Sequence, residues 1–297
     1  MRALTHFIIA IIGSLVLAAV LAYPLYVVIH PLQPIWRFDK IATRLFQLLA
    51  LIAVLVIVKQ RALTTRHAWG YGIPKSLWRQ QAAWGALVGI LSMLPISLAM
   101  DLLGIRTLLP NLDISQTLRA LLAGLGSGLA VGFLEETFFR GLMQGAVLRE
   151  MKKPWLGLLL VAVIYAALHF LARVRIPAEA VTWHSGLDLL SGVAAQFFAP
   201  STIIDSFLSL TAVGLLLGLV SHWSGSIAWA VGLHAGWVMM MRTTIGITTL
   251  EHDAPQHWLI SQSDGYTGWL VLSWTLVMTL ALIANRQRLI SGRLVNR

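Results

Sequence analysis

The sequence predicts an all-α protein, a polytopic bundle of about eight transmembrane helices. Of its 297 residues, 58% are hydrophobic and only 11% are charged, and the mean hydropathy is +0.78. Apolar runs recur along the chain, and a helix needs about 20 apolar residues to cross the hydrocarbon core of a bilayer. No change in composition marks a linker, so we expect residues 1–297 to form a single transmembrane domain.

Each predicted span is an apolar run with polar or charged residues at its ends. The first run is too long for the core of a signal peptide, so we interpret it as a retained span. The fourth run, of about 31 residues, is longer than a bilayer requires and is expected to tilt or protrude. The predicted spans cover residues 7–29, 41–58, 81–103, 118–148, 155–172, 206–222, 227–241 and 268–285.

Charge and cysteine content narrow the classes of function. The formal net charge of +10 would suit a nucleic-acid-binding protein, but the Lys and Arg residues fall at the ends of predicted spans. The positive-inside rule explains them better, so we expect no nucleic-acid partner and place both termini in the cytoplasm. Twelve Trp residues suit the two membrane interfaces. Because the chain has no Cys, a thiol nucleophile, a disulfide and a thiolate metal site are excluded.

The fourth predicted span carries three charged residues in its apolar interior. Ionisable groups at this depth cost about 2.5–3.5 kcal/mol each and usually mark a function. Glu136 and Arg140 are four residues apart, so they share a helix face and can pair. Glycine recurs every fourth residue along that face from Gly124 to Gly132, which allows close approach of a neighbouring helix. Glu135 lies about 100° around the helix from Glu136. We therefore expect a structural Glu136–Arg140 ion pair and assign chemistry to Glu135.

Two histidines lie inside other predicted spans. His169 falls late in the fifth span and His234 falls within the seventh. Glu135 and His169 are each about 14 residues from the short basic loop that joins their spans, so at 1.5 Å per residue both lie ~21 Å deep. A carboxylate and an imidazole at one depth can together activate a water molecule, and a third group such as His234 can stabilise an oxyanion. The sequence thus predicts a hydrolytic centre without a nucleophilic side chain.

These residues resemble the motifs of a known family, the type II CAAX prenyl endopeptidases and bacteriocin-processing enzymes, also called CPBP or ABI. The motifs of that family are EExxxR, FxxxH and HxxxN, each on its own transmembrane helix. They correspond here to Glu135–Arg140, Tyr165–His169 and His234–Val238. The similar core covers about residues 118–241.

The resemblance implies a glutamic intramembrane endopeptidase with an eight-helix bundle, in a bacterial inner membrane. By position, Glu135 and His169 would activate the water, and His234 would help to form the oxyanion hole. Glu136 and Arg140 would stabilise the site. The substrate would be a protein or peptide in the lipid bilayer, such as a membrane-associated or exported precursor. The oligomeric state does not follow from the sequence.

Two residues differ from the pattern of the family. Tyr165 replaces Phe and keeps an aromatic ring, whereas Val238 replaces Asn and has no hydrogen-bond donor. Either His234 acts alone, or another donor such as Ser226 or Trp237 assists it, or the activity is weakened. The alternative motivated by Val238 is a non-catalytic membrane scaffold or bacteriocin self-immunity protein of the same fold.

Two further alternatives concern the ionisable residues. Membrane carboxylates and histidines also build proton relays, so a proton-coupled carrier is a candidate, although no inverted repeat is found in the sequence. We expect no cofactor, because the sequence has no H-E-x-x-H motif. Zinc is the alternative, and its ligands would be Glu135, His169 and His234.

Overall fold

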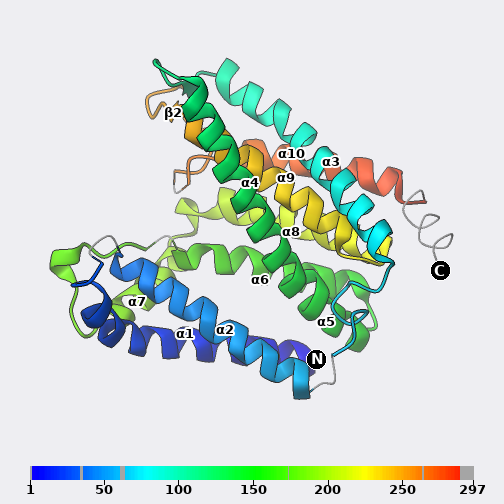
Figure 1. Cartoon of the computed structure of the whole chain (residues 1–297), viewed down its shortest axis with the longest axis horizontal. Coiled ribbons are helices and arrows are strands. Elements are labelled where there is room, and N and C mark those ends of the chain that lie inside the picture. The colour runs from blue at the N-terminus through cyan, green and yellow to red at the C-terminus, as the bar shows by residue number, and fades with distance from the viewer. Residues whose placement is uncertain (1, 34–35, 61–63, 173, 263, 288–297) are drawn as a thin grey trace. The chain divides into compact units, whose positions relative to one another are not determined.

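The computed structural model is almost entirely helical and divides into two compact units (Figure 1). It describes residues 2–33, 36–60, 64–172, 174–262 and 264–287. Unit 1 comprises Met1–Thr64 and Ile164–Ile204, and unit 2 comprises Thr65–Val163 and Asp205–Arg297. The single transmembrane domain stays a prediction.

Helices provide nearly all of the regular structure. The α-helices are α1 (Arg2–Ile29), α2 (Phe38–Gln60), α3 (Lys75–Leu102), α4 (Ile114–Glu136), α5 (Gly145–Glu150), α6 (Pro154–His169), α7 (Ser185–Phe198), α8 (Ile204–Ser224), α9 (Ala228–Ile247) and α10 (Trp269–Ala284). A π-helix, η1 (Thr137–Gln144), joins α4 to α5. Short 3-10 helices are η2 (Phe170–Ala172), η3 (Ala178–Ala180), η4 (Pro200–Thr202) and η5 (His257–Leu259), and two strands are β1 (Arg106–Leu108) and β2 (Thr248–Leu250).

Every predicted span coincides with an observed helix, and most boundaries agree within a few residues. Within the described residues, five helical segments are long and apolar enough to cross a membrane: α1, α2, α3, the continuous segment Ile114–Glu150, and α8. α6 and α10 are apolar but shorter. The all-α class and the integral membrane location are therefore confirmed, whereas the count of eight spans stays a prediction.

Unit 1 is built on the pairing of α1 with α2, with α7 packed on α1. The hairpin core contains Tyr26, which lies edge-on to Phe38 with ring centroids 5.6 Å apart. Gly186, in the first turn of α7, has no room for a Cβ because the backbone of Ala19 lies against it. The close contact holds α7 against α1, and this helix lies in the segment between the fifth and sixth predicted spans.

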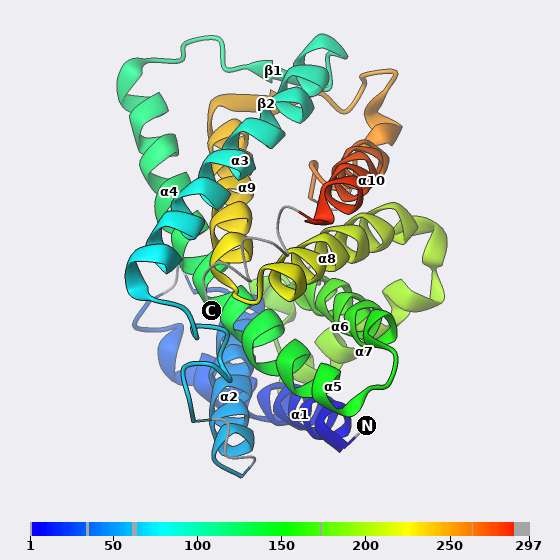
Figure 2. The ribbon, with the colours of Figure 1, turned by 90° about the vertical axis from the view of Figure 1, so that its right-hand side faces the viewer.

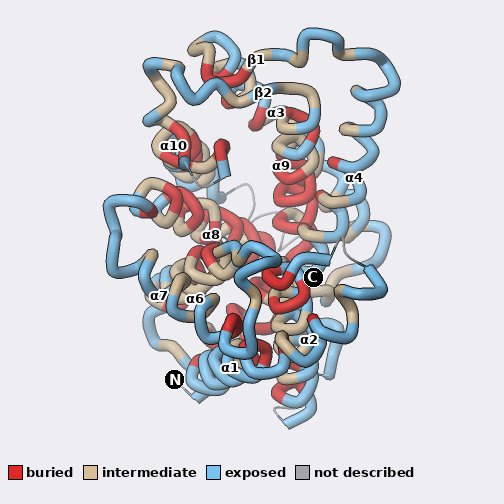
Figure 3. The backbone as a smooth tube through the Cα atoms, turned by 90° about the vertical axis from the view of Figure 1, so that its left-hand side faces the viewer, coloured by how far each residue is buried: buried red, intermediate tan, exposed pale blue. Residues whose placement is uncertain are grey.

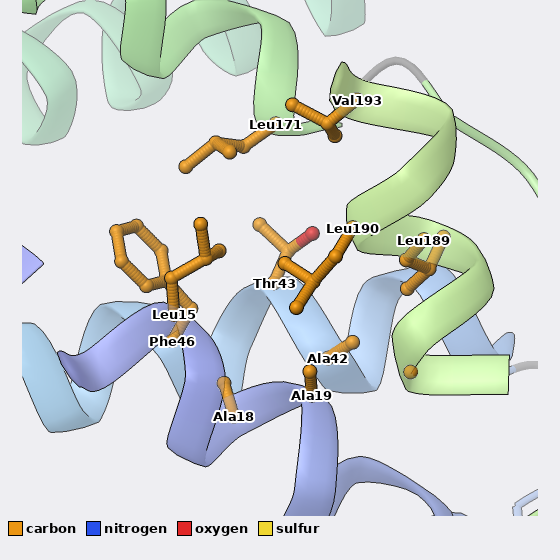
Figure 4. A pocket seen from close by; sticks show the side chains of 11 residues that line it. Leu15, Ala18, Ala19, Ala42, Thr43, Phe46, Leu171, Leu189, Leu190 and Val193 are labelled. Carbon is orange, nitrogen blue, oxygen red and sulfur yellow. The ribbon is translucent and has the colours of Figure 1, made fainter. Parts of the chain in front are cut away.

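A pocket in unit 1 lies between α1, α2, η2 and α7 (Figure 4). Its lining is apolar, with side chains such as Leu15, Phe46 and Leu190 directed into it. The single polar side chain of the lining is Thr43, whose hydroxyl donates to the backbone carbonyl of Asp39 at 2.8 Å. None of the described residues of the lining is titratable.

Unit 2 is organised around α9, which packs between α3 and α4 (Figure 2). Glycines occupy both contacts: a Cβ on Gly236 of α9 would lie 2.5 Å from the carbonyl oxygen of Ala86 in α3, and one on Gly132 of α4 would lie 2.8 Å from that of Val231. Backbones approach this closely only where small residues face each other. α9 is buried over most of its length, whereas much of α4 is exposed (Figure 3). The contacts fix the rotation and height of α9 against both neighbours.

Replacing Gly128 with Ala is expected to destabilise unit 2, because its Cβ would overlap the carbonyl oxygen of Ala235. Overpacking of this kind costs about 1–3 kcal/mol. The matched control is Gly126→Ala on the same helix, where a Cβ meets nothing within 4 Å. Ala is a better helix former than Gly, so the control variant should be as stable as the native protein or slightly more so. Thermal unfolding in detergent micelles compares the two, and equal midpoints would contradict a tight α4–α9 contact.

The connection between α3 and α4 is tied to the segment that follows α9. β1 pairs antiparallel with β2, with Arg106 opposite Leu250. The buried guanidinium of Arg106 donates to the carbonyl oxygen of Gly265 at 2.9 Å and to the hydroxyl of Thr248 at 3.1 Å. These bonds close the loops at one end of the α3–α4–α9 layer.

Candidate active site

The carboxylate of Glu136 forms a hydrogen bond on one side and an ion pair on the other. Its Oε1 lies 2.8 Å from Nδ1 of His234, and its Oε2 lies 3.3 Å from Nε of Arg140. All three residues are buried, with exposed fractions of 0%, 5% and 3% for Glu136, His234 and Arg140. An ionised carboxylate only accepts hydrogen bonds, so Nδ1 of His234 carries the proton and donates it. The three side chains form one buried charged cluster between α4, η1 and α9.

The ion pair between Glu136 and Arg140 is present, as their spacing on one helix predicts. The hydrogen bond from His234 to Glu136 is not predicted, because the two residues are 98 positions apart on different helices. The sequence suggests His234 only as a group for an oxyanion. In the structure His234 first serves as a partner of Glu136, and any role toward a substrate has to use the other ring nitrogen.

Arg140 and Gln144 anchor the π-helix η1 to α8. Nη2 of Arg140 donates to the carbonyl oxygen of Gly214 at 3.0 Å, and Nε2 of Gln144 donates to that of Gly218 at 3.1 Å. The two donors are four residues apart on η1, and the two acceptors are four residues apart on α8. The two hydrogen bonds therefore form parallel links between the helices. Gly218 makes room for this link, since a Cβ there would lie 2.9 Å from Oε1 of Gln144. Gln144 was missed in the sequence, although it is a polar residue one turn beyond Arg140 in an apolar run.

The π-helix begins directly after Glu136. The predicted span 118–148 is one helical segment, but its middle part is wound as a π-helix from Thr137 to Gln144. Such turns are rare and occur frequently at functional sites. Arg140 lies within this turn, and its guanidinium carbon is 5.6 Å from the ring centre of Phe139. Hydropathy does not distinguish a π-helix from an α-helix, so the sequence predicts only the span.

Glu135 is the last residue before Glu136 in α4. It is partly buried, and its Oε2 atom is shielded from solvent. Its helical position directs it about 100° away from the direction of Glu136. The two adjacent carboxylates therefore lie in different surroundings, as their positions on the helix predict.

His169 is the last residue of α6 and belongs to unit 1, whereas Glu135 belongs to unit 2. Its Nδ1 lies 2.8 Å from the backbone carbonyl oxygen of Tyr165, and the two rings are 4.4 Å apart. A carbonyl only accepts, so Nδ1 is protonated, and in the neutral ring Nε2 is then the nitrogen that accepts a proton. This tautomer suits a base. The pairing of His169 with Glu135 stays a prediction.

Val238 is buried one turn beyond His234. Of the two donors that the sequence offers in place of Asn, Trp237 donates its indole N–H to the hydroxyl of Ser92 at 2.9 Å. Ser226 donates its hydroxyl to the carbonyl oxygen of Gly70 at 3.3 Å. Both side chains thus already donate a hydrogen bond within unit 2, Trp237 to α3 and Ser226 to the loop before α3, and His234 is the donor to be tested.

The zinc alternative requires three ligands in one place. Within the described ranges, no group of three His, Asp or Glu side chains is arranged to hold a metal ion. Glu136, the carboxylate of the buried cluster, already forms an ion pair with Arg140 and a hydrogen bond with His234. The absence of a cofactor stays a prediction.

The fold and the cluster define a polytopic helical membrane protein with buried ionisable residues at helix contacts. A family model described as type II CAAX prenyl endopeptidase Rce1-like matches residues 117–240. The match confirms the family resemblance over nearly the same range that the motifs define, and it includes all five predicted site residues. The family points to a protease, a peptide hydrolase of the CAAX type. No curated protein and no solved structure matches the chain.

Proposed function

We propose that the protein is a glutamic intramembrane endopeptidase that hydrolyses a peptide bond of a membrane-associated or exported precursor. The observation that supports this proposal most is the bonding of Glu136 to both Arg140 and His234. A carboxylate held on both sides is poorly placed to take a proton from water. We therefore assign the general base to the adjacent Glu135, which lies outside this ion pair.

The proposed reaction needs one water and one proton carrier. Glu135 takes a proton from the water as the water oxygen attacks the carbonyl carbon of the peptide. The electrons of the C=O double bond move to the carbonyl oxygen. When the tetrahedral intermediate collapses, the C–N bond breaks and Glu135 returns the proton to the leaving nitrogen. His169 would share this work, since its Nδ1 bond to the carbonyl of Tyr165 presents Nε2 as a proton acceptor.

His234 would stabilise the oxyanion through Nε2. Its Nδ1–H is held by Glu136, which fixes the orientation of the ring in the way a carboxylate orients a catalytic histidine. With Nδ1–H donated to Glu136, a hydrogen bond from Nε2 to the oxyanion requires a ring that is protonated on both nitrogens. One oxyanion donor typically lowers the activation barrier by about 2.7–4 kcal/mol. We assign this contribution to His234, because position 238 carries Val in place of Asn.

The proposed location rests on the charges at the ends of the spans and on the family resemblance. We place both termini in the cytoplasm of a bacterial cell, with about eight spans in the inner membrane. The substrate would be a precursor with a membrane anchor, chemically a peptide next to an apolar group. A prenyl group, which the description of the matching family names, is the first such group to test.

The experiment is a cleavage assay with purified protein in lipid nanodiscs. The probe is a quenched fluorescent peptide with a farnesylated Cys followed by three residues, and the same peptide without the farnesyl group is the second probe. We expect release of the terminal residues from at least one probe, with the cleaved bond identified by mass spectrometry. The non-catalytic scaffold, which Val238 favours, predicts cleavage of neither probe, together with full biological effect of the Glu135→Gln variant.

Chelation is expected to leave cleavage unchanged, because the proposed base, relay and oxyanion donor are all side chains. The measurement combines elemental analysis of the purified protein with the assay after dialysis against EDTA and 1,10-phenanthroline. Stoichiometric zinc whose removal abolishes cleavage would overturn the metal-free mechanism. In that case Glu135, His169 and His234 would be re-examined as ligands.

A further inference from the structure

The segment of residues 65–74, which we call the strap, precedes α3 and contacts η1. The hydroxyl of Tyr71 lies 2.5 Å from the hydroxyl of Thr137, the first residue of η1. On the same helix, a Cβ added to Gly141 would lie 2.5 Å from the carbonyl oxygen of Trp69. Two neighbouring strap residues therefore contact the turn that follows the paired glutamate.

The strap also contacts the start of α9. The carbonyl oxygen of Gly70 accepts hydrogen bonds from the backbone N–H of Ile227 at 3.1 Å and from the hydroxyl of Ser226 at 3.3 Å. Gly70 has a φ of +79°, which favours glycine, and a Cβ there would lie 2.5 Å from Cγ2 of Ile227. Three consecutive strap residues thus join the helix that carries Arg140 to the helix that carries His234.

The direction of the Tyr71–Thr137 bond can be assigned. The hydroxyl of Thr137 donates its proton to the carbonyl oxygen of Phe133 at 2.6 Å, so it accepts from Tyr71. Burial raises the pKa of Tyr71 above its ordinary value, so this hydroxyl stays protonated and remains a donor. The ring of Tyr71 packs against Trp78 and Phe133, with centroids 5.7 and 6.0 Å away. A Phe ring would keep this packing and lose only the hydrogen bond.

We propose that Tyr71 is a positioning residue for the Glu136–His234 pair. Its bond to Thr137 holds the first turn of η1, directly after Glu136, while Gly70 holds the start of α9. The strap, which belongs to neither helix, thereby holds the carboxylate of Glu136 and the imidazole of His234 in position relative to each other. The inference rests on the proposed function for its kinetic consequence, but the geometry of the pair can be measured without a substrate.

The test uses three single variants and one double variant of the full chain in nanodiscs. Tyr71→Phe and Thr137→Val each remove one partner of the hydrogen bond, and the double variant removes both. Tyr266→Phe is the matched control, because it removes another buried tyrosine hydroxyl of unit 2, in the loop before α10. The two readouts are the kinetics of peptide cleavage and the ¹⁵N NMR signals of His234, assigned with a His234→Gln variant.

We expect Tyr71→Phe and Thr137→Val each to lower kcat about three- to tenfold, the range that one hydrogen bond supplies, with KM unchanged. The double variant should lose no more than Thr137→Val alone, because that single variant already lacks the Tyr71–Thr137 bond as well as the bond from Thr137 to Phe133. The signals of His234 should shift in both single variants and stay unchanged in Tyr266→Phe. Unfolding midpoints should stay close to the native value.

Two results would overturn the inference. Unchanged His234 signals in Tyr71→Phe and Thr137→Val would show that the strap does not position the pair, whether or not the protein cleaves the probe. Losses in kcat that multiply in the double variant would show that the two hydroxyls act separately. Failure of the proposed function looks different, since the native protein would then cleave neither probe, while the NMR signals of His234 would still report on the strap.

Discussion

Replacement of Glu135 by Gln is expected to lower kcat for peptide cleavage by about 10²–10⁴-fold, the contribution of a general acid–base group. Gln has nearly the same shape but cannot take a proton from water. The ion pair of the cluster is made by the neighbouring Glu136, so this substitution should leave it intact. Membrane insertion and the unfolding midpoint should therefore match those of the native protein.

The control for this variant is Glu179→Gln, the same chemical change at an exposed residue of η3. It should leave kcat and stability unchanged. Undiminished cleavage by Glu135→Gln would remove Glu135 from the mechanism and with it the proposed division between the two glutamates. Flux of protons through vesicles that depends on Glu135, without cleavage, would instead support the carrier alternative.

The features that sequence reasoning predicted are those encoded locally. Hydropathy places the helices, because a membrane span depends on the composition of one continuous segment. The pairing of Glu136 with Arg140 follows from a four-residue spacing within one helix. The glycine pattern from Gly124 to Gly132 predicts a close helix contact without naming the partner, which the structure identifies as α9.

The features that the sequence did not predict depend on contacts between distant segments. The bond from His234 to Glu136 requires α9 to lie beside α4, and that placement is set by glycine contacts along both faces of α9. The strap is a short polar loop with aromatic residues, and only the fold brings Tyr71 to Thr137. The π-helix has no hydropathy signal at all. Long-range packing, which periodicity does not encode, therefore completes the candidate site.

Replacement of Glu136 by Ala is expected to destabilise unit 2 by about 3–5 kcal/mol, the usual cost of removing one partner from a buried ion pair. Arg140 would keep its bond to the carbonyl of Gly214 but lose its counter-charge, and His234 would lose its acceptor. The unfolding midpoint in detergent and the yield of inserted protein measure this effect. A midpoint equal to that of the native protein would contradict the buried ion pair.

A double variant separates the two roles of Glu136. Glu136→Leu with Arg140→Leu removes both charges, and apolar replacement of a buried pair is often neutral or stabilising, so most of the lost stability should return. His234 would still lack the carboxylate that orients its ring, so cleavage should stay low even though the protein folds. Recovery of both stability and cleavage would mean that Glu136 serves only to neutralise Arg140. Recovery of stability alone is the expected result, and it would show that the second glutamate of the motif stabilises the fold through Arg140 and supports the chemistry through His234.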